Sequence, residues 1–507
     1  MSQHYLLAHD LGTTGNKATL FDAEAGVVTA STFEPYPTFY PQAGWAEQDS
    51  TDWQRAIWEA TRRLIAQAGI RPGAIAAVSF SGHMQGVLLV DRQGAPLGRA
   101  IIWADQRATA QTDFIGSVCG AEAIYRLTGQ RLSPTYTAPK VLWIKDHLPA
   151  AYAQAYKVLQ AKDYAAFLLT GALATDHSDA SGTLLFDLTR RRWAAEVITA
   201  LGLNGELFPE VLASTAVVGR VTPAAAAASG LVAGTPVVIG GGDGACATVG
   251  ACSVKEGDAY AYVGSSSWIA VTVRQPIMDP LQRTYTMAHL MPGFCFSLGT
   301  MQAAGGSYAW LERLLNPAGN GQTLAALDDL AAGVPAGARG LMFLPYLMGE
   351  RSPYWNPLAR GAFVGLAMPH GQAEAARAVL EGVALNLRLI LDALRAQEVH
   401  IGRLLLIGGG AKSPVWRQIL ADVLELPLWL PELTAEATAL GAVVAGGVGV
   451  GLFADFSVVD RLIALREAER PDPVRGQHYA ALLEPFRQAY AALKPVFAEL
   501  ARLSAVE

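Results

Sequence analysis

Asp243 is the acidic residue best placed for acid–base chemistry. It follows three glycines, Gly240–Gly242, that end the short apolar run 235–239, and small residues follow it. An apolar run that ends in glycines predicts a buried strand and a tight turn. Glycines there would let another molecule approach the backbone closely, and the carboxylate could take a proton from a reacting hydroxyl. The same residue also fits a turn aspartate that caps the next helix.

Asp10 is a second carboxylate at the end of a predicted strand. The turn after it, Gly12–Gly15, offers backbone N–H groups and the hydroxyls of Thr13 and Thr14 before a second strand begins. Such a turn suits an anion such as a phosphate, with the carboxylate holding a hydrated cation beside it. Taken alone, a segment of this kind is more often a plain hairpin.

The hairpin pattern returns in the second half of the chain. Residues 258–273 again predict a strand, a turn and a strand, and the turn Gly264–Ser267 corresponds to Gly12–Gly15. Two similar hairpins predict two domains of related architecture, each with a phosphate-binding turn. A further glycine turn, suited to a nucleoside or a phosphate, follows the apolar run 404–407 and contains Gly409, Gly410 and Ala411.

Two other predicted strands, near 74–80 and 101–107, end in polar and aromatic side chains. A polyhydroxylated ligand such as a sugar needs mixed donors and acceptors together with an aromatic face. The side chains that offer this mixture are His83, Met84, Gln85, Trp103, Asp105 and Arg107. Taken singly, His83 fits a structural histidine and Trp103 a core tryptophan.

Two patterns point to chemistry that the rest of the sequence does not support. His177 with Asp176 and Asp179 suggests a metal site, but a capped surface loop is the better interpretation of this turn-rich segment. Gly240-x-Gly242-x-x-Ala245 matches a dinucleotide-binding fingerprint after a strand. The acid expected at the end of the next strand is missing, because Asp258 precedes that strand.

The elements that must position these residues alternate between strands and helices. Apolar residues recur at helical spacing over 49–68, with Ser50 or Thr51 as the N-cap. Further helices are expected over most of 120–200, over 222–229 and 374–396, over 436–445 as a companion to the glycine turn, and over 471–500. The last of these is amphipathic and is expected to dock on the body of the protein.

Composition narrows the class of protein. Of the 507 residues, 51% are apolar and 16% charged, which is enough for a large core and argues against disorder. A net charge of −6 argues against nucleic-acid binding. The four cysteines are widely spaced, as in a reducing compartment. The N-terminus does not resemble a signal peptide, and the uncharged stretch 437–454 is too glycine-rich for a spanning helix. We therefore expect a cytoplasmic protein without a membrane partner.

The residue inventory fits phosphoryl transfer, which needs positioning, charge neutralisation and a base for the attacking hydroxyl. Competing motifs are missing: the sequence has no GxxxxGK[ST], no HExxH, no GxSxG and no protein-kinase set.

A series of short motifs resembles the FGGY family of carbohydrate kinases from about residue 5 to residue 500, and within it the xylulokinase branch most. The motifs are Asp10–Gly15, Trp45–Asp49, Ala138–Trp143, Ser178–Thr183, Gly240–Asp243, Leu344–Pro353 and Ile407–Gly410. The resemblance implies an α/β, actin-like ATPase (ribonuclease H-like) fold in which two similar domains flank a catalytic cleft. The domains would be 1–250, on the sugar and magnesium side, and 251–507, on the ATP side, with a C-terminal helix docking back.

The resemblance also implies roles for the residues above. Asp243 would deprotonate a sugar hydroxyl, and Asp10 would help to hold Mg²⁺. The ATP phosphates would lie against Thr13, Thr14, Gly264, Ser265 and Ser266, and the adenosine against Gly409, Gly410 and Ala411. The sugar pocket would be lined by Met84, Gln85, Trp103, Asp105, Asp243 and Gly244.

The implied reaction is ATP-dependent phosphorylation of D-xylulose to D-xylulose 5-phosphate. Two residues depart from the usual pattern of that branch, which has His in place of Gln85 and Asn or Gln in place of Gly244. Sites that bind hydroxyls discriminate sharply when a partner is lost. Another ketose, a polyol or a sugar acid, such as ribulose, glycerol or gluconate, is therefore the alternative. An actin- or chaperone-like ATPase without a sugar substrate is a further one. A homodimer is compatible with the sequence.

Overall fold

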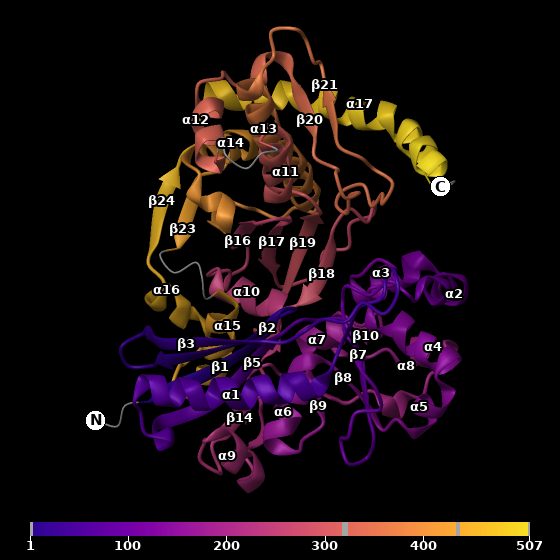
Figure 1. Ribbon diagram of the computed structural model, residues 1–507, viewed down its shortest axis with the longest axis vertical. Helices are drawn as coiled ribbons and strands as arrows, with labels where there is room; N and C mark the ends of the chain where they lie inside the picture. The colour runs from indigo at the N-terminus through magenta and orange to yellow at the C-terminus, as the bar shows by residue number, and fades with distance from the viewer. Residues whose placement is uncertain (1–3, 317–322, 432–436, 505–507) are drawn as a thin grey trace.

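The first of two seven-stranded sheets forms the core of the lower lobe in Figure 1. The computed structural model describes residues 4–316, 323–431 and 437–504. The strands run in the order β13-β14-β5-β1-β2-β3, and β15 pairs with β5. Their bounds are β1 Tyr5–Leu11, β2 Gly15–Asp22, β3 Val27–Pro35, β5 Ile75–Gly82, β13 Val217–Arg220, β14 Pro236–Val238 and β15 Gly241–Gly242.

The second sheet lies in the other lobe and repeats this topology in the order β18-β19-β17-β16-β22-β23-β24. Its strands are β16 Ala259–Val263, β17 Ser267–Val273, β18 Tyr285–Ala288, β19 Cys295–Met301, β22 Leu404–Ile407, β23 Leu428–Pro431 and β24 Leu465–Glu469. In each sheet an antiparallel meander is followed by two parallel strands and an antiparallel edge strand. The predicted repeat is confirmed, and the fold is an actin-like ATPase fold.

Two helices, α10 (Asp243–Gly250) and α15 (Ala437–Gly449), lie between the two sheets (Figure 1). A Cβ on Gly441 would collide with the carbonyl oxygen of Cys246, and one on Gly250 with that of Ala437, so these helices touch backbone to backbone. Helix α15 is the companion helix predicted at 436–445; residue 436 lies outside the described residues. It packs on β1 and β5 of the first sheet, so the chain returns to the first lobe near its end.

The outer side of the first sheet is covered by α1 (Ser50–Ala68), α6 (Ala161–Thr170) and α9 (Pro223–Ser229). Helix α1 buries one face, including Trp53, Ile57 and Leu64. The N-cap of this helix is Asp49, which accepts a hydrogen bond from Thr51 N; the predicted caps Ser50 and Thr51 are wrong by one or two residues.

A helical insert extends the first lobe and reaches the edge of the second sheet. It contains α2 (Thr109–Cys119), α3 (Ala121–Thr128), α4 (Thr137–His147), α5 (Pro149–Gln154), α7 (His177–Ser181) and α8 (Ala195–Ala200). The helices from α3 onward lie in the segment 120–200 that the sequence predicts to be mostly helical, whereas α2 precedes it and was not predicted. Edge strand β18 is bound by the insert, because Thr286 N donates to Gly129 O at 2.9 Å and Gln130 Nε2 donates to Thr286 O at 2.7 Å. These bonds join the two lobes.

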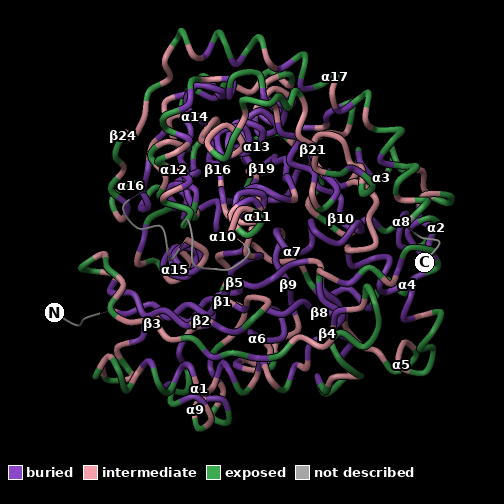
Figure 2. The backbone as a smooth tube through the Cα atoms, turned by 45° about the horizontal axis from the view of Figure 1, so that its top comes forward, coloured by how far each residue is buried: buried purple, intermediate pink, exposed green. Residues whose placement is uncertain are grey.

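The second lobe packs around one buried helix, α13 (Gln372–Arg395), whose backbone is largely coloured as buried in Figure 2. Its neighbours are α11 (Gly305–Leu315), α12 (Leu324–Ala332), α14 (Pro414–Leu424) and α17 (Pro473–Ser504). The buried side chains Tyr479, Leu483, Phe486, Tyr490 and Phe497 form one face of α17. The amphipathic C-terminal helix predicted from the sequence is thus confirmed.

The remaining elements are short. They are β4 Glu47–Gln48, β6 Leu88–Val90, β7 Ala100–Ile101, β8 Lys157–Leu159, β9 Ala174–Asp176, β10 Phe186–Asp187, β11 Arg192–Trp193, β12 Glu210–Leu212, β20 Met342–Leu344, β21 Ala362–Val364 and α16 Val459–Leu462. Across the described residues, no helix combines the length and apolar character that crossing a membrane requires.

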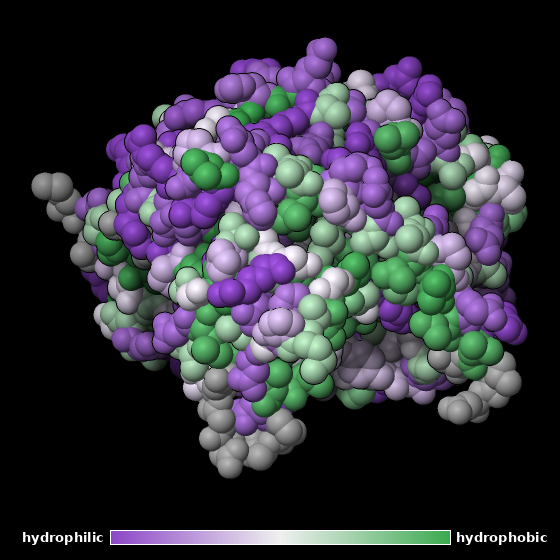
Figure 3. Space-filling model, turned by 90° about the horizontal axis from the view of Figure 1, so that it is seen from above, coloured by the Kyte–Doolittle hydropathy of each residue, from purple (hydrophilic) through white to green (hydrophobic). Residues whose placement is uncertain are grey.

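Seen from above, the surface mixes hydrophilic and hydrophobic residues (Figure 3).

Candidate active site

Asp10 and Asp243 come together at one edge of the first sheet. Strands β1, β5 and β15 are parallel, and Asp10 and Gly241 are both in register with Ser81 of the strand between them. Parallel strands end at the same edge of a sheet. The two carboxylates predicted from separate parts of the sequence therefore share this edge.

Asp243 lies in the first turn of α10, the helix that lies between the two sheets. Its Oδ1 accepts a hydrogen bond from Gly244 N at 2.7 Å. Burial, together with the negative charge of Asp10, raises the pKa of Asp243 from 3.8 to about 7. The helix is capped by Gly242, so the alternative that Asp243 is the cap is wrong. A carboxyl group with a pKa near neutrality is suited to accept a proton from a hydroxyl.

The glycines before Asp243 make room for the protein's own atoms. Gly240 has a φ of 68°, and a Cβ there would collide with the carbonyl oxygen of Phe80. A Cβ on Gly242 would lie 2.5 Å from Cγ of Met84. The expectation that these glycines admit another molecule is therefore wrong, because they let β15 and α10 pack against β5 and the loop after it.

Asp10 is held by a residue from the far end of the chain. Thr438 Oγ1, on α15, donates a hydrogen bond of 2.6 Å to Asp10 Oδ2. Mg²⁺ binds oxygen ligands and usually takes only one or two carboxylates, with water and phosphate completing its shell. The described residues contain no group of three or more His, Cys, Asp or Glu that could hold a metal alone. The pair at this edge fits a phosphate-bound Mg²⁺ of that kind.

The first hairpin turn is fixed through its carbonyl groups. Tyr36 OH donates to Gly12 O at 2.6 Å, and Gln48 Nε2 donates to Thr13 O at 2.8 Å. Trp103 Nε1 donates to Thr13 Oγ1 at 3.0 Å, while the side chain of Thr14 is exposed. Three hydrogen bonds thus fix the turn at Gly12 and Thr13, while the hydroxyl of Thr14 is exposed to solvent.

The two turns predicted for ATP lie side by side in the second lobe. Strand β16 pairs with β22 so that Tyr262 is in register with Ile407, which brings the turns after them together. Gly305 N, at the start of α11, donates to Gly264 O at 2.8 Å. The exposed residues in these turns are Ser265 and Gly409, and a Cβ on Gly409 would meet nothing within 4 Å.

The residues predicted for the sugar differ in their freedom to bind a ligand. Met84 is buried against Gly242, whereas Gln85 is half-buried with a φ of 67°, a strained backbone for a residue with a side chain. Trp103 is 38% exposed, so the alternative of a core tryptophan is wrong. Asp105 is fully buried and accepts hydrogen bonds from Ala46 N and Arg107.

His83 is structural, as the alternative interpretation expects. It is buried, lies 3.1 Å from Gln48 Oε1 through Nε2 and meets the ring of Trp53 edge to face. Burial, with Lys140 nearby, lowers the pKa of His83 to about 4.

Lys140 is a structural residue of the site that the sequence prediction missed. Its buried Nζ donates to the carbonyl oxygens of Gln85, Ile102 and Thr135, at 3.0, 2.7 and 2.6 Å. Burial lowers the pKa of Lys140 to about 7. The lysine thus ties the loop that carries Met84 and Gln85 to two other segments. A lone lysine within the apolar segment Ala138–Trp143 was the available signal.

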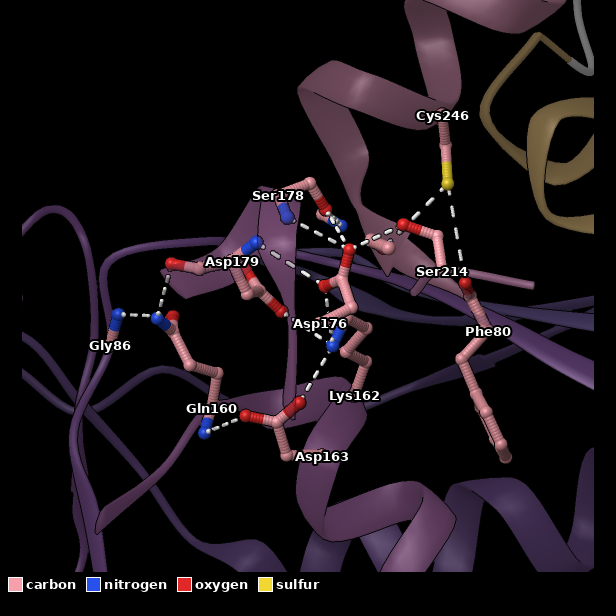
Figure 4. Close-up of polar contacts among 12 residues, drawn as sticks. Phe80, Gly86, Gln160, Lys162, Asp163, Asp176, Ser178, Asp179, Ser214 and Cys246 are labelled. Atoms are coloured by element: carbon pink, nitrogen blue, oxygen red, sulfur yellow. Dashed lines mark hydrogen bonds and ion pairs between the residues drawn. The ribbon is translucent and has the colours of Figure 1, made fainter. Parts of the chain in front are cut away.

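A buried ion cluster lies behind the site (Figure 4). Lys162 Nζ lies 2.6 Å from Asp163 Oδ1, 2.9 Å from Asp176 Oδ1 and 3.1 Å from Asp179 Oδ2, and all four side chains are at most 1% exposed. The surface loop predicted for Asp176–Asp179 is therefore wrong, although Asp176 does cap α7. Its polar residues are buried because Lys162 provides the compensating charge.

The comparisons with known proteins agree with this geometry. Residues 5–250 match the N-terminal domain, and residues 259–450 the C-terminal domain, of the FGGY family of carbohydrate kinases. A xylulose kinase of Klebsiella pneumoniae is 35% identical over 96% of this chain and 99% of its own length.

Two solved structures are similar over nearly the whole chain. A xylulose kinase of Rhodospirillum rubrum has a TM-score of 0.92 at 31% identity, and a gluconate kinase of Lactobacillus acidophilus has a TM-score of 0.92 at 29% identity. Each comparison covers 98% of this chain and 100% of the other. Several relatives over 30% identical are xylulose kinases. This chain is a sugar kinase and belongs to the FGGY family of carbohydrate kinases.

Proposed function

We propose that the protein transfers the γ-phosphate of ATP to a hydroxyl of a ketopentose, with D-xylulose as the substrate and D-xylulose 5-phosphate as the product. Asp243 is the general base in this proposal. The observation that carries it is a carboxyl with a pKa near 7, beside Asp10, at a sheet edge that faces the second lobe.

The role of Asp243 follows from its surroundings. Its charge acts on Tyr260 of the second sheet, where burial, with this charge adding to it, raises the pKa of the phenol to about 12. Asp243 therefore lies within reach of groups from both lobes, where an acceptor hydroxyl and a phosphoryl donor could meet. Asp243 accepts the hydroxyl proton as the hydroxyl oxygen forms its bond to the γ-phosphorus. The bond between the γ-phosphorus and the bridging oxygen breaks, and ADP leaves with that electron pair.

The phosphate groups of ATP are assigned to the two hairpin turns and the adenosine to the third turn. Thr13, Thr14 and Gly264–Ser266 hold the phosphates, and Gly409–Ala411 lie beside the nucleoside. Asp10 would hold Mg²⁺ at this edge of the sheet through its carboxylate oxygens. Bound Mg²⁺ would offset the negative charge of the phosphates.

The acceptor pocket is assigned to Met84, Gln85, Trp103, Asp105 and Gly244. Trp103 offers an exposed ring beside Thr13. Asp105 acts mainly by holding Arg107 and Ala46, since its oxygens are already engaged. Gln85 has a half-buried side chain that is able to donate to and accept from hydroxyls.

A second acceptor class, the sugar acids, has support from Gly244. A Cβ there would touch only Met84 Sδ and Phe296 Cζ, each at the ordinary distance of 3.8 Å, so the site has room for a larger acceptor. The likeness to a gluconate kinase points the same way.

The two classes are separated by coupled ADP-release kinetics with ketoses, polyols and sugar acids. We expect kcat/KM to be highest for D-xylulose, and Gly244→Asn, which the space admits, to lower activity on larger acceptors selectively. Preference for gluconate would overturn the ketopentose assignment and leave the family standing. ATP hydrolysis that ignores every acceptor would overturn the kinase proposal itself.

The proposal extends to the organisation of the chain. We assign residues 1–250 and 251–507 to two domains, one for each sheet, with α15 of the second domain lying on the first. A cytoplasmic setting is supported by the cysteines, all four of which are free thiols. The homodimer stays a prediction.

A further inference from the structure

Asp176 is a fully buried carboxylate that ends β9 and starts α7. Its Oδ2 accepts hydrogen bonds from Ser178 Oγ at 2.6 Å, from Ser214 Oγ at 2.7 Å and from Ser178 N at 2.9 Å. Its Oδ1 lies 2.9 Å from Lys162 Nζ. Burial alone would raise the pKa of Asp176, but Lys162 and the serine hydroxyls lower it overall, so the group is charged and accepts only.

Ser178 connects this carboxylate to the backbone that directly precedes the proposed base. The Ser178 hydroxyl has one proton, which it gives to Asp176, so its lone pairs are available as acceptors. Gly242 N donates to Ser178 Oγ at 2.9 Å. Gly242 is the cap residue of α10 and directly precedes Asp243. Figure 4 shows Ser178 and Ser214 converging on Asp176.

The same region supports a second loop of the site. Gln160 Nε2 donates to Asp179 O at 3.2 Å, and Gly86 N donates to Gln160 Oε1 at 3.1 Å (Figure 4). Gly86 ends the segment that carries Met84 and Gln85. The short helix α7, anchored by Lys162, thus contacts the backbone before Asp243 directly and the sugar loop through Gln160.

We propose that Ser178, oriented by the charged Asp176, is a positioning residue for Asp243. The hydrogen bond from Gly242 N fixes the peptide that leads into α10 and so sets where the base carboxylate lies relative to the acceptor hydroxyl. This inference rests on the proposed function, in which Asp243 is the base. Catalytic rates depend steeply on such placement, and a shift of about 1 Å costs up to about 10²-fold.

Ser214 provides a matched control for Ser178. Both hydroxyls are at most 1% exposed, and both donate to the same oxygen of Asp176. Only Ser178 Oγ accepts from Gly242, whereas Ser214 meets Gly240 N through its backbone carbonyl, which an alanine keeps. Ser178→Ala and Ser214→Ala therefore lose one equivalent bond each and differ in the link to α10.

The test compares Ser178→Ala, Ser214→Ala and Asp243→Asn with the acceptor that gives the fastest ADP release. The number of ATP-binding sites is counted by calorimetric titration, and kcat is expressed per site. A variant that only folds less well has fewer sites but the same kcat per site. For Ser178→Ala we expect kcat per site to fall about 10- to 100-fold with KM for ATP within about twofold. Ser214→Ala should stay within about threefold of the parent, and both should melt at similar temperatures.

Equal kcat per site in the two serine variants, with Asp243→Asn inactive, would overturn the positioning role and leave the proposed function intact. Full activity of Asp243→Asn would overturn both. If Ser178→Ala does not fold, Ser178→Cys keeps the volume and accepts only weakly, so its kcat should fall as well. Parental kcat in Ser178→Cys would contradict the proposal.

Discussion

Replacing Asp243 by Asn should stabilise the protein while it removes catalysis. The carboxyl is held at a place where ionisation is unfavourable, since burial and Asp10 raise its pKa from 3.8 to about 7. A group with a raised folded-state pKa contributes stability below its unfolded pKa and loses that contribution as pH rises through the folded pKa. An asparagine keeps the acceptor for Gly244 N and carries no charge.

The size of this effect follows from the same pKa. A difference between 3.8 and about 7 corresponds to about 4 kcal/mol once the folded carboxyl is ionised. Partial contact with solvent reduces it, so we expect the variant to gain about 2–4 kcal/mol of unfolding free energy at pH 8. At pH 4 the gain should fall below about 1 kcal/mol, because this pH lies only just above the unfolded pKa of 3.8 and the cost of ionising the folded carboxyl has hardly developed.

Thermal unfolding of the two proteins at pH 4, 5, 6, 7 and 8 measures this difference. The gap in melting temperature should open between pH 4 and 7 and stay constant above that range. A gap that does not depend on pH, or a variant less stable than the parent at pH 8, would refute the assignment of a raised pKa to Asp243.

Three further outcomes are expected. The value of kcat/KM for the acceptor should rise about tenfold per pH unit below pH 7 and level off above it, because only ionised Asp243 accepts a proton; a flat profile would contradict this. Lys162→Met should destabilise the fold by about 3–5 kcal/mol, because it leaves buried carboxylates unpaired. The control Lys255→Met breaks an exposed ion pair and should cost less than about 1 kcal/mol. Equal losses of unfolding free energy in denaturant would contradict this prediction. Gly240→Ala should lower the yield of folded protein, whereas Gly409→Ala should not, since a Cβ collides with the backbone at the first position and meets nothing within 4 Å at the second. Circular dichroism and thermal unfolding of both variants measure this, and equal losses of folded protein would contradict it.

The strands and turns of the site were accessible from sequence because each follows a simple local pattern. Asp10 and Asp243 both end apolar runs, and parallel strands bring such ends to one edge. The repeated hairpin at Gly264 made the second lobe predictable in the same way. Patterns of apolar residues and glycine thus sufficed for the frame and for the two carboxylates.

The supporting residues were not accessible, because their partners are remote in the chain. Asp176 and Asp179 resemble an exposed, polar turn until Lys162 is placed beside them. Thr438 reaches Asp10 only because α15 returns to the first sheet. The engagement of Asp105 by Arg107, two residues later, is the exception that a local pattern could have revealed.

The most direct test of the account is the fate of the γ-phosphate. The parent protein and Asp243→Asn are incubated with ATP, Mg²⁺ and D-xylulose, and the products are followed by ³¹P nuclear magnetic resonance. We predict one sugar phosphate formed for each ADP by the parent, and a rate about 10²–10⁴-fold lower for the variant despite unchanged ATP binding. ADP that accumulates with inorganic phosphate alone, or a variant that forms sugar phosphate at the parental rate, would contradict it.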